Sequence, residues 1–257
     1  MRMKLFILLL LAILTHGNII AQQNVPNGAS LLLKAYPSTI KHYKDGYLIM
    51  VNGNSIKYMK STEDKSHIEL INSDNIGDIF IYPYIKGAVK DIPQNHDPGR
   101  IRSENLLKVM YGSTAAQVGQ NLTTITWCPK LVNQKLRVTK INGVDKQLQK
   151  VSDELDNYPE LKDYLQNSST FYWRNVRGSK RLSTHSFGIA IDLNTKYSNY
   201  WQWDCRCSSE TTVLGYRNRI PQLIVDIFEK HGFIWGGKWY HYDTMHFEYR
   251  PELLEDN

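Results

Sequence analysis

Residues 189–194 are the most restrictive segment of this 257-residue chain. Large apolar residues there alternate with Ala190, Asp192 and Asn194. This alternation predicts a β-strand with one apolar face and a second face that carries Asp192. Because an isolated carboxylate in apolar surroundings is costly, Asp192 must be paired with a cation or bind a metal ion. The fold has to provide that partner.

A second segment, residues 240–249, gathers histidines and acids among aromatic residues. If its second half is a strand, His246 and Glu248 share one face and the aromatic residues pack behind them. The candidate ligands are then His185, Asp192 and His246, a set that suits a catalytic zinc ion with an open fourth position. The alternative is a buried, hydrogen-bonded cluster without metal, because structural ion-pair networks imitate such sites.

Hydrolysis at a zinc site also needs a carboxylate that takes and returns a proton. Asp243, three residues before His246, suits that role, and the alternative is an acid in a turn before the strand. Glu248 is the natural partner to orient a ligand, and otherwise it is an ordinary acid on a strand face. His241 fits either the site or a turn, and we favour the turn.

The two segments together form a multi-position pattern. It reads Ser183-x-His185-x-x-Gly188-x-Ala190-x-Asp192, followed by Asp243-x-x-His246. The pattern resembles that of the zinc D-alanyl-D-alanine carboxypeptidases of the VanY type, which share a zinc-site fold with the Hedgehog signalling domain and with phage L-alanyl-D-glutamate endolysins. The resemblance implies His185, Asp192 and His246 as zinc ligands. It also implies Asp243 as the catalytic base, and we expect Ser183 beside the ligands in a supporting place.

The same family has an arginine on a strand before the first motif, where it helps to hold the substrate and the developing oxyanion. Arg174 occupies that place here and is our choice. Because the interval from Arg174 to His185 is shorter than in many relatives, Arg177 and Arg181 remain alternatives. The alternative without a function is that Arg174 lies at the surface or in an ion pair.

Strands and helices do not alternate regularly along the chain. The expected strands are residues 47–51 and 55–59 around Asn52-Gly53, residues 79–85 (at an edge or in a turn, because of Pro83), and residues 122–128 and 135–141; the expected helices are residues 103–111 and 147–155 and one that opens at Pro221. This order favours an α+β fold, a mostly antiparallel sheet with flanking helices, over a doubly wound parallel sheet. The resemblance implies the Hedgehog/D-Ala-D-Ala peptidase-like form. We expect residues 22–150 to be an N-terminal region of unknown role packed on a catalytic domain of residues 151–257.

The first 21 residues have the composition of a secretory signal peptide, with Arg2 and Lys4 before an apolar run that leads to Ala21. The run is too short to span a bilayer comfortably, so an uncleaved anchor is the less favoured reading. Cleavage after Ala21 or Gly17 would give an exported protein, periplasmic or secreted. Loss of Arg2 and Lys4 lowers the net charge from +6 to +4, and no cluster of basic residues that could follow phosphates appears. We therefore expect no nucleic-acid partner and no stable membrane span after cleavage.

The chain has 3 cysteines, too few for a disulfide scaffold. Cys205-Arg-Cys207 lacks the spacing that is typical of zinc ligands. In an oxidising compartment we expect a disulfide from Cys128 to Cys205 or to Cys207, with one thiol left over.

The residues and the resemblance together predict a zinc-dependent D-alanyl-D-alanine carboxypeptidase that hydrolyses peptidoglycan stem peptides, with Zn²⁺ as cofactor. One alternative keeps the fold and cuts another bond, as a peptidoglycan endopeptidase for L-Ala-D-Glu or a crossbridge. The other alternative is a zinc-containing module that binds the cell wall without catalysis. Asp243 argues against pure binding, since binding alone needs no proton transfer.

Overall fold

The computed structural model describes residues 24–62 and 64–255. The expected signal peptide, residues 1–21, lies outside this part of the chain. Among the described residues, no helix has the length and apolar character needed to cross a membrane.

The strands of the described residues form three small sheets, and every pair within them is antiparallel. The first sheet has β1 (Ile40–Lys44), β2 (Tyr47–Met50) and β3 (Ser55–Lys57) in that order. The second sheet pairs β4 (Leu122–Trp127) with β5 (Gln134–Thr139). The third sheet has β6 (Ala190–Asp192), β8 (His246–Tyr249) and β7 (Phe233–Trp235) in that order. The fold is therefore α+β, as the sequence predicts. Among the described residues the single mostly antiparallel sheet is not found, because long connections separate the three groups of short strands and each strand pairs only within its own group.

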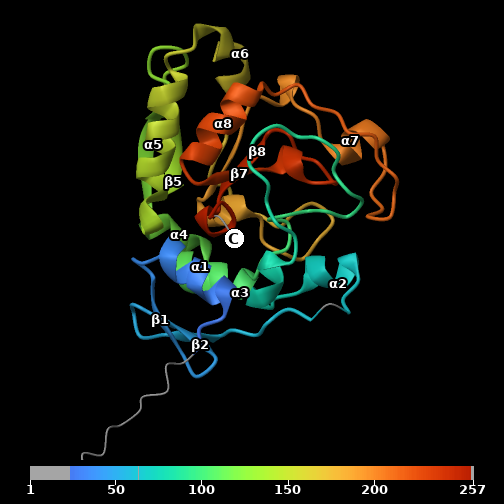
Figure 1. The fold of residues 1–257 in the computed structure, drawn as a ribbon. Helices are drawn as coiled ribbons and strands as arrows, with labels where there is room; N and C mark the ends of the chain where they lie inside the picture. Colours follow the sequence, from blue (N-terminus) through green and yellow to red (C-terminus); the bar gives the residue numbers. More distant parts are fainter. Residues whose placement is uncertain (1–23, 63, 256–257) are drawn as a thin grey trace, which may run out of the picture.

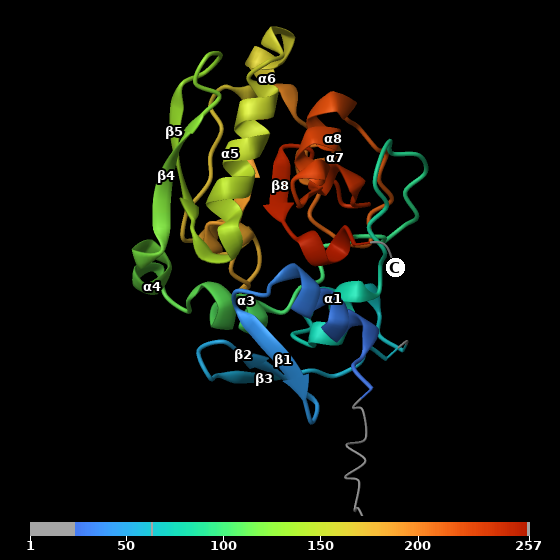
Figure 2. The ribbon, with the colours of Figure 1, turned by 60° about the vertical axis from the view of Figure 1, so that its left-hand side comes forward.

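The helices cover these sheets. They are α1 (Asn27–Ala35), α2 (His67–Asn72), α3 (Glu104–Tyr111), α4 (Ala115–Gln120), α5 (Val144–Leu155), α6 (Lys162–Leu165), α7 (Trp201–Cys205) and α8 (Gln222–Lys230). Helix α5 lies between the β4–β5 hairpin and α8, with α1 and the first sheet below them (Figures 1 and 2). The predicted helices at 103–111, at 147–155 and after Pro221 correspond to α3, α5 and α8.

The sequence prediction of local elements holds for the hairpins and fails for residues 79–85. Strands β2 and β3 flank the Asn52-Gly53 turn as expected. Residues Ile76–Phe80 instead form a 3-10 helix, which the Asn75 side chain caps by accepting from the Gly77 N–H. Ile76 and Ile79, three residues apart, are both buried, so the apolar run is satisfied by helical spacing rather than by strand pairing.

Strand β8 at the centre of the third sheet has different surroundings on its two faces. Phe247 stacks on Phe228 of α8 with ring centroids 3.9 Å apart, and Tyr249 packs on Phe233. Since side chains alternate along a strand, His246 and Glu248 point away from α8. The prediction that these two residues share a face with the aromatic residues behind them is confirmed.

The N-terminal residues pack directly on the C-terminal ones. The Tyr84 hydroxyl donates to Glu229 (2.6 Å) and accepts from the Trp235 N–H (2.9 Å), and the Tyr36 hydroxyl donates to Glu252. Buried apolar side chains from both parts belong to one continuous core. The boundary expected after residue 150 falls within α5, and the division into two domains stays a prediction.

Candidate active site

His185 lies in a tight 3-10 turn, Thr184–Phe187, which the sequence builds with two flanking residues. The Ser183 side chain caps the turn by accepting from the His185 N–H at 3.4 Å. Gly188 ends it in the left-handed region at φ 68°, where a Cβ would come within 2.8 Å of Leu122 Cδ2. A side chain at position 188 would therefore be strained and crowded, and the glycine lets the chain pass from the His185 turn into β6.

The ring of His185 has one nitrogen fixed and one free. Nδ1 lies 2.6 Å from the Thr170 carbonyl oxygen, so it carries the proton and donates. Nε2 lies 3.1 Å from Asp192 Oδ1, but it is buried and has no hydrogen-bond partner in the part of the chain that the structure describes. This orphaned nitrogen is the kind of atom that a cation would satisfy.

His246 faces the same carboxylate from β8. Strand pairing sets Asp192 opposite His246, and His246 Nδ1 lies 3.0 Å from Asp192 Oδ1. Its Nε2 lies 3.2 Å from Glu248 Oε2 and 3.3 Å from Thr184 Oγ1. Glu248 therefore orients the ring, as its position in the strand predicts.

The predicted ligand set is brought together in space. One ligand atom each from His185, Asp192 and His246 lies within 4.8 Å of the others. Two imidazole nitrogens and one carboxylate oxygen match the donors of a catalytic zinc site. Together with the unbonded Nε2 of His185, the donor set fits a zinc ion.

Burial and close opposite charges set the pKa values of these groups. Burial would raise the pKa of Asp192, but the attraction of His185 and the hydrogen bond from His246 hold it well below its ordinary range. Burial would lower the pKa of His246, but Asp192 and Glu248 raise it to about 10. The pocket therefore favours positive charge beside Asp192.

Asp243 is a half-buried carboxyl. Its Oδ1 is buried and has no hydrogen-bond partner among residues 24–62 and 64–255. Burial, and then repulsion from Asp192, raise the pKa of Asp243 to about 7. Its backbone N–H donates to the Gly236 carbonyl oxygen at 3.0 Å, and a Cβ at Gly236 would lie 2.5 Å from the Asp243 carbonyl oxygen. The close glycine turn thus fixes a carboxyl whose proton is easily gained and lost near neutral pH.

Arg250 holds the Glu248 carboxylate in place, and the sequence analysis did not identify it. It is fully buried, and its guanidinium donates to Glu248 Oε1 at 3.0 Å and to Glu252. Burial would raise the pKa of Glu248, but His246 and Arg250 lower it to about 2. The signal was present, since His246, Glu248 and Arg250 are spaced two residues apart and extend one strand face.

Arg174 is fastened to the His185 turn through its backbone. Its N–H donates to Ser186 Oγ at 2.9 Å, and its carbonyl oxygen accepts from the Ser183 N–H at 3.0 Å. Its side chain lines the cavity over the site, as does that of Arg177. Arg181 is absent from the lining, so of the two alternatives only Arg177 shares the place of Arg174.

A cavity of about 500 Å³ opens over the site. Besides the ligands, Asp243 and Glu248, its lining includes Tyr200, Trp201, Trp203, Trp239, Met245, Arg100, Arg102, Arg174 and Arg177. The walls are thus aromatic and cationic, and the floor carries the histidines and acids. Such a pocket suits a ligand with apolar parts and negative charge.

With this geometry in view, comparison with known proteins gives one match. Residues 177–249 match the sequence model of a family described as D-alanyl-D-alanine carboxypeptidase. The family resemblance is confirmed over that segment. At family level the segment is that of a carboxypeptidase-like peptidase, and it contains His185, Asp192, Asp243 and His246. No curated protein and no solved structure matches the chain.

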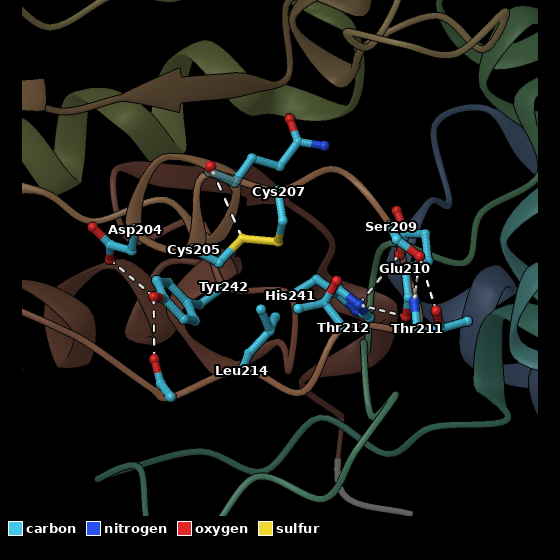
Figure 3. The surroundings of a disulfide bond; sticks show 12 residues. Asp204, Cys205, Cys207, Ser209, Glu210, Thr211, Thr212, Leu214, His241 and Tyr242 are labelled. Atoms are coloured by element: carbon cyan, nitrogen blue, oxygen red, sulfur yellow. Dashed lines mark hydrogen bonds and ion pairs between the residues drawn. A yellow bond between two sulfur atoms is a disulfide. The ribbon is translucent and has the colours of Figure 1, made fainter.

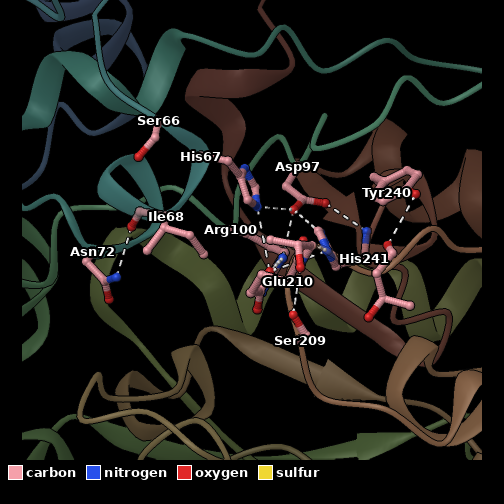
Figure 4. Close-up of polar contacts among 12 residues, drawn as sticks. Ser66, His67, Ile68, Asn72, Asp97, Arg100, Ser209, Glu210, Tyr240 and His241 are labelled. Carbon is pink, nitrogen blue, oxygen red and sulfur yellow. Dashed lines mark hydrogen bonds and ion pairs between the residues drawn. The ribbon is translucent and has the colours of Figure 1, made fainter.

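A second histidine and carboxylate cluster lies around Arg100 (Figure 4). His241 Nδ1 lies 2.7 Å from Asp97 Oδ2, and His67 Nε2 lies 3.2 Å from the same oxygen. The Arg100 guanidinium donates to Asp97 at 2.7 Å and to both oxygens of Glu210. The preference for His241 in a mere turn was therefore wrong. The cluster was not visible in the sequence because its members come from separate segments.

The predicted disulfide is also corrected. Cys205 and Cys207 pair with each other (Figure 3). Cys128 is a buried thiol. Arg206 between them has φ 54°, a left-handed conformation that brings the two Cα atoms to 5.2 Å. Cys128 follows β4 inside the core beside Ser152, and burial raises its pKa to about 12. Its place in the core keeps it away from the other two cysteines.

Proposed function

We propose that this protein is an exported, zinc-dependent D-alanyl-D-alanine carboxypeptidase that hydrolyses peptidoglycan stem peptides. The observation that carries the proposal is the buried, unbonded Nε2 of His185, which faces Asp192 and His246 in a cavity that also holds Asp243. The family match supports peptidase chemistry for the same residues. We also propose that β6, β8 and β7 with α8 form the Hedgehog/D-Ala-D-Ala peptidase-like zinc fold.

His185, Asp192 and His246 would hold the metal. A zinc ion bound there supplies a Lewis acid that lowers the pKa of water and polarises a carbonyl group. Asp243 takes the proton that the attacking water gives up. It then donates that proton to the leaving nitrogen as the carbon–nitrogen bond breaks, which leaves a carboxylic acid and an amine. A pKa of about 7 suits a group that must do both.

Arg174 lies where it can stabilise the transition state. It lines the same cavity, and its charge favours the ionised form of Asp243. A guanidinium there can donate hydrogen bonds to the oxygen that becomes negative as water adds to the carbonyl. The backbone bonds to Ser183 and Ser186 hold it in register with the His185 turn.

The decisive experiment is digestion of purified muropeptides by the zinc-loaded protein, followed by mass spectrometry. We expect stems that end in D-alanyl-D-alanine to lose one alanine. Release of a longer stem or separation of crosslinked stems would instead establish the endopeptidase alternative. No change in any muropeptide, with zinc bound, would overturn peptidase function in favour of a binding module. The His246→Ala variant is the inactive control.

A further inference from the structure

A loop from the N-terminal part, residues 96–102, forms one wall of the cavity. The Tyr240 N–H donates to the His96 carbonyl oxygen and the His241 N–H donates to Asp97, both at 2.9 Å. Gly99 is at φ 97°, where a Cβ would lie 2.3 Å from Ile234 Cδ1. The loop is therefore pressed against β7 and the segment that leads to β8, and it is fixed there.

Arg102 ends this loop with its side chain buried at the cavity. It is 9% exposed and belongs to the lining. Its guanidinium donates to the carbonyl oxygens of Arg100 (3.4 Å) and Leu182 (2.9 Å). Within residues 24–62 and 64–255, no carboxylate accepts a hydrogen bond from it. An arginine has five N–H donors, so most of its capacity is open.

Two neighbouring arginines, Arg100 (half-buried) and Arg250 (buried), show what Arg102 lacks. Arg100 binds Asp97 and Glu210. Arg250 binds Glu248 and Glu252 in the same way. Each of these two has its pKa raised despite burial, because its carboxylates favour the charge.

Arg102 shows the opposite effect. Burial lowers its pKa, and the positive charges of Arg250 and Arg100 lower it further. Glu248 and Glu104 attract it, but the oxygens of Glu248 are already bound by His246 and Arg250, and those of Glu104 by Lys108 and the Leu182 N–H. A buried cation without an anion is costly, and a carboxylate entering the cavity would remove that cost.

We propose that Arg102 binds a carboxylate group of the substrate peptide. The geometry of a guanidinium favours a bidentate pair with such a group. Arg174 and Arg177, which also line the cavity, are exposed to solvent. Arg102 would thus determine specificity from the part of the chain that precedes the family match. The proposal rests on the proposed peptidase function.

The carboxylate has two sources in a stem peptide, the C-terminus and an acidic residue within the stem. Two substrate pairs distinguish them. The first pair is diacetyl-L-Lys-D-Ala-D-Ala and its C-terminal amide. The second pair is L-Ala-γ-D-Glu-L-Lys-D-Ala-D-Ala with the glutamate α-carboxylate free or amidated. In each pair the ratio of kcat/KM values measures the preference for the carboxylate, and an inactive fraction of protein cancels from it.

The test compares the wild-type protein with Arg102→Gln. A hydrogen bond between charged groups corresponds to about a tenfold to hundredfold preference. We expect the wild type to show it for one pair and Arg102→Gln to reduce that ratio to near 1. Arg219→Gln is the matched control, because Arg219 also donates to a backbone carbonyl oxygen, that of Ser198, but does not line the cavity. It should keep the wild-type ratio.

Each other outcome has a defined meaning. An unchanged ratio in Arg102→Gln, or a wild type without preference in either pair, overturns the proposal. If Arg102→Gln does not fold, Arg102→Lys is measured instead, and it should keep only part of the ratio because lysine cannot form the bidentate pair. If the wild type cleaves none of the four peptides, the proposed function fails. The same ratios are then measured as Kd values by calorimetry with the zinc-loaded protein, which decides the role of Arg102 separately.

Discussion

Two clusters of histidine and carboxylate lie in this protein, and they differ in what neutralises them. In the first cluster, His185, Asp192 and His246 meet without an arginine among them, and one buried imidazole nitrogen has no hydrogen-bond partner among the described residues. In the second cluster, His67, Asp97, Glu210 and His241 surround the guanidinium of Arg100. Residue types alone would make both clusters metal sites. The comparison shows that charge balance decides, because Arg100 already occupies the place of a cation in the second cluster.

The largest effect expected from this difference is on metal binding. His246→Ala should abolish zinc binding and reduce hydrolysis on the order of 10³-fold or more, because a three-ligand site loses one ligand. His67→Ala is the matched control from the second cluster and should keep one zinc ion per chain. Metal content by atomic emission and peptide hydrolysis measure both. Zinc lost from His67→Ala but kept by His246→Ala would reverse the assignment of the two clusters.

The next effect separates metal binding from proton transfer within the first cluster. Asp243→Asn should keep zinc and lower kcat by about 10²–10⁴-fold, because asparagine cannot carry the proton. Zinc content and thermal unfolding of the variant show whether the site is intact. Wild-type kcat in Asp243→Asn would remove Asp243 from the mechanism.

The second cluster should respond in stability rather than in chemistry. Arg100→Met leaves Asp97 and Glu210 without their cation and should lower the free energy of unfolding by about 3–5 kcal/mol. Arg177→Met, at an exposed position, should change it by less than about 0.5 kcal/mol. Urea unfolding of the metal-free proteins measures both. Equal effects would mean that Arg100 does not hold the cluster together.

Acid should weaken the second cluster in a predictable direction. Burial would raise the pKa of Glu210, but His67 and Arg100 lower it to about 2, and Arg100 likewise holds the pKa of Asp97 well below its ordinary value. Folding lowers the pKa values of both carboxyl groups. The stability that Glu210 contributes is therefore present above pH 4.5, and that of Asp97 above pH 3.8. It is lost as the pH falls below those values. Glu210→Gln should show a shallower loss of unfolding free energy with acid, and an identical slope would contradict the assignment.

The smallest effect concerns the Cys205–Cys207 disulfide, which lies along the chain between Trp203 of the cavity wall and Glu210 of the second cluster. Reduction of Cys205–Cys207 opens a very short loop and should cost at most about 1–2 kcal/mol. Alkylation of the denatured, unreduced protein should label Cys128 alone, as peptide mass mapping will show. Label on Cys205 or Cys207 would instead support the disulfide with Cys128 that the sequence predicts.

The sequence predicts the first cluster because local alternation encodes it. Asp192, His246 and Glu248 lie on short strands whose apolar neighbours fix the direction of each side chain. The second cluster depends on segments that meet only in the folded chain, so no spacing reveals it. The disulfide was mispredicted for a related reason, since the burial of Cys128 in the core is a property of packing.

Sequence analysis could not identify Arg102, because what distinguishes it is the lack of a hydrogen-bonded carboxylate among the described residues. A count of basic residues cannot separate it from Arg100 or Arg250, both of which have carboxylate partners. Likewise, the run at 79–85 reads as a strand until the buried faces of Ile76 and Ile79 show helical spacing. Local pattern therefore predicts elements and ligands, while pairing of charges requires the tertiary structure.

The hydrogen bond from Arg250 to the Gly99 carbonyl oxygen (3.3 Å) joins residues 151 positions apart in the chain. Contacts of such large sequence separation form late and slow the folding of a domain. Arg250 also fixes Glu248, so the pocket reaches its final shape only when the loop around Gly99 and the C-terminal strand have met. A protease cut in the loop at Gly99 should therefore disrupt the pocket and abolish its proposed activity, although every proposed metal ligand would remain in place.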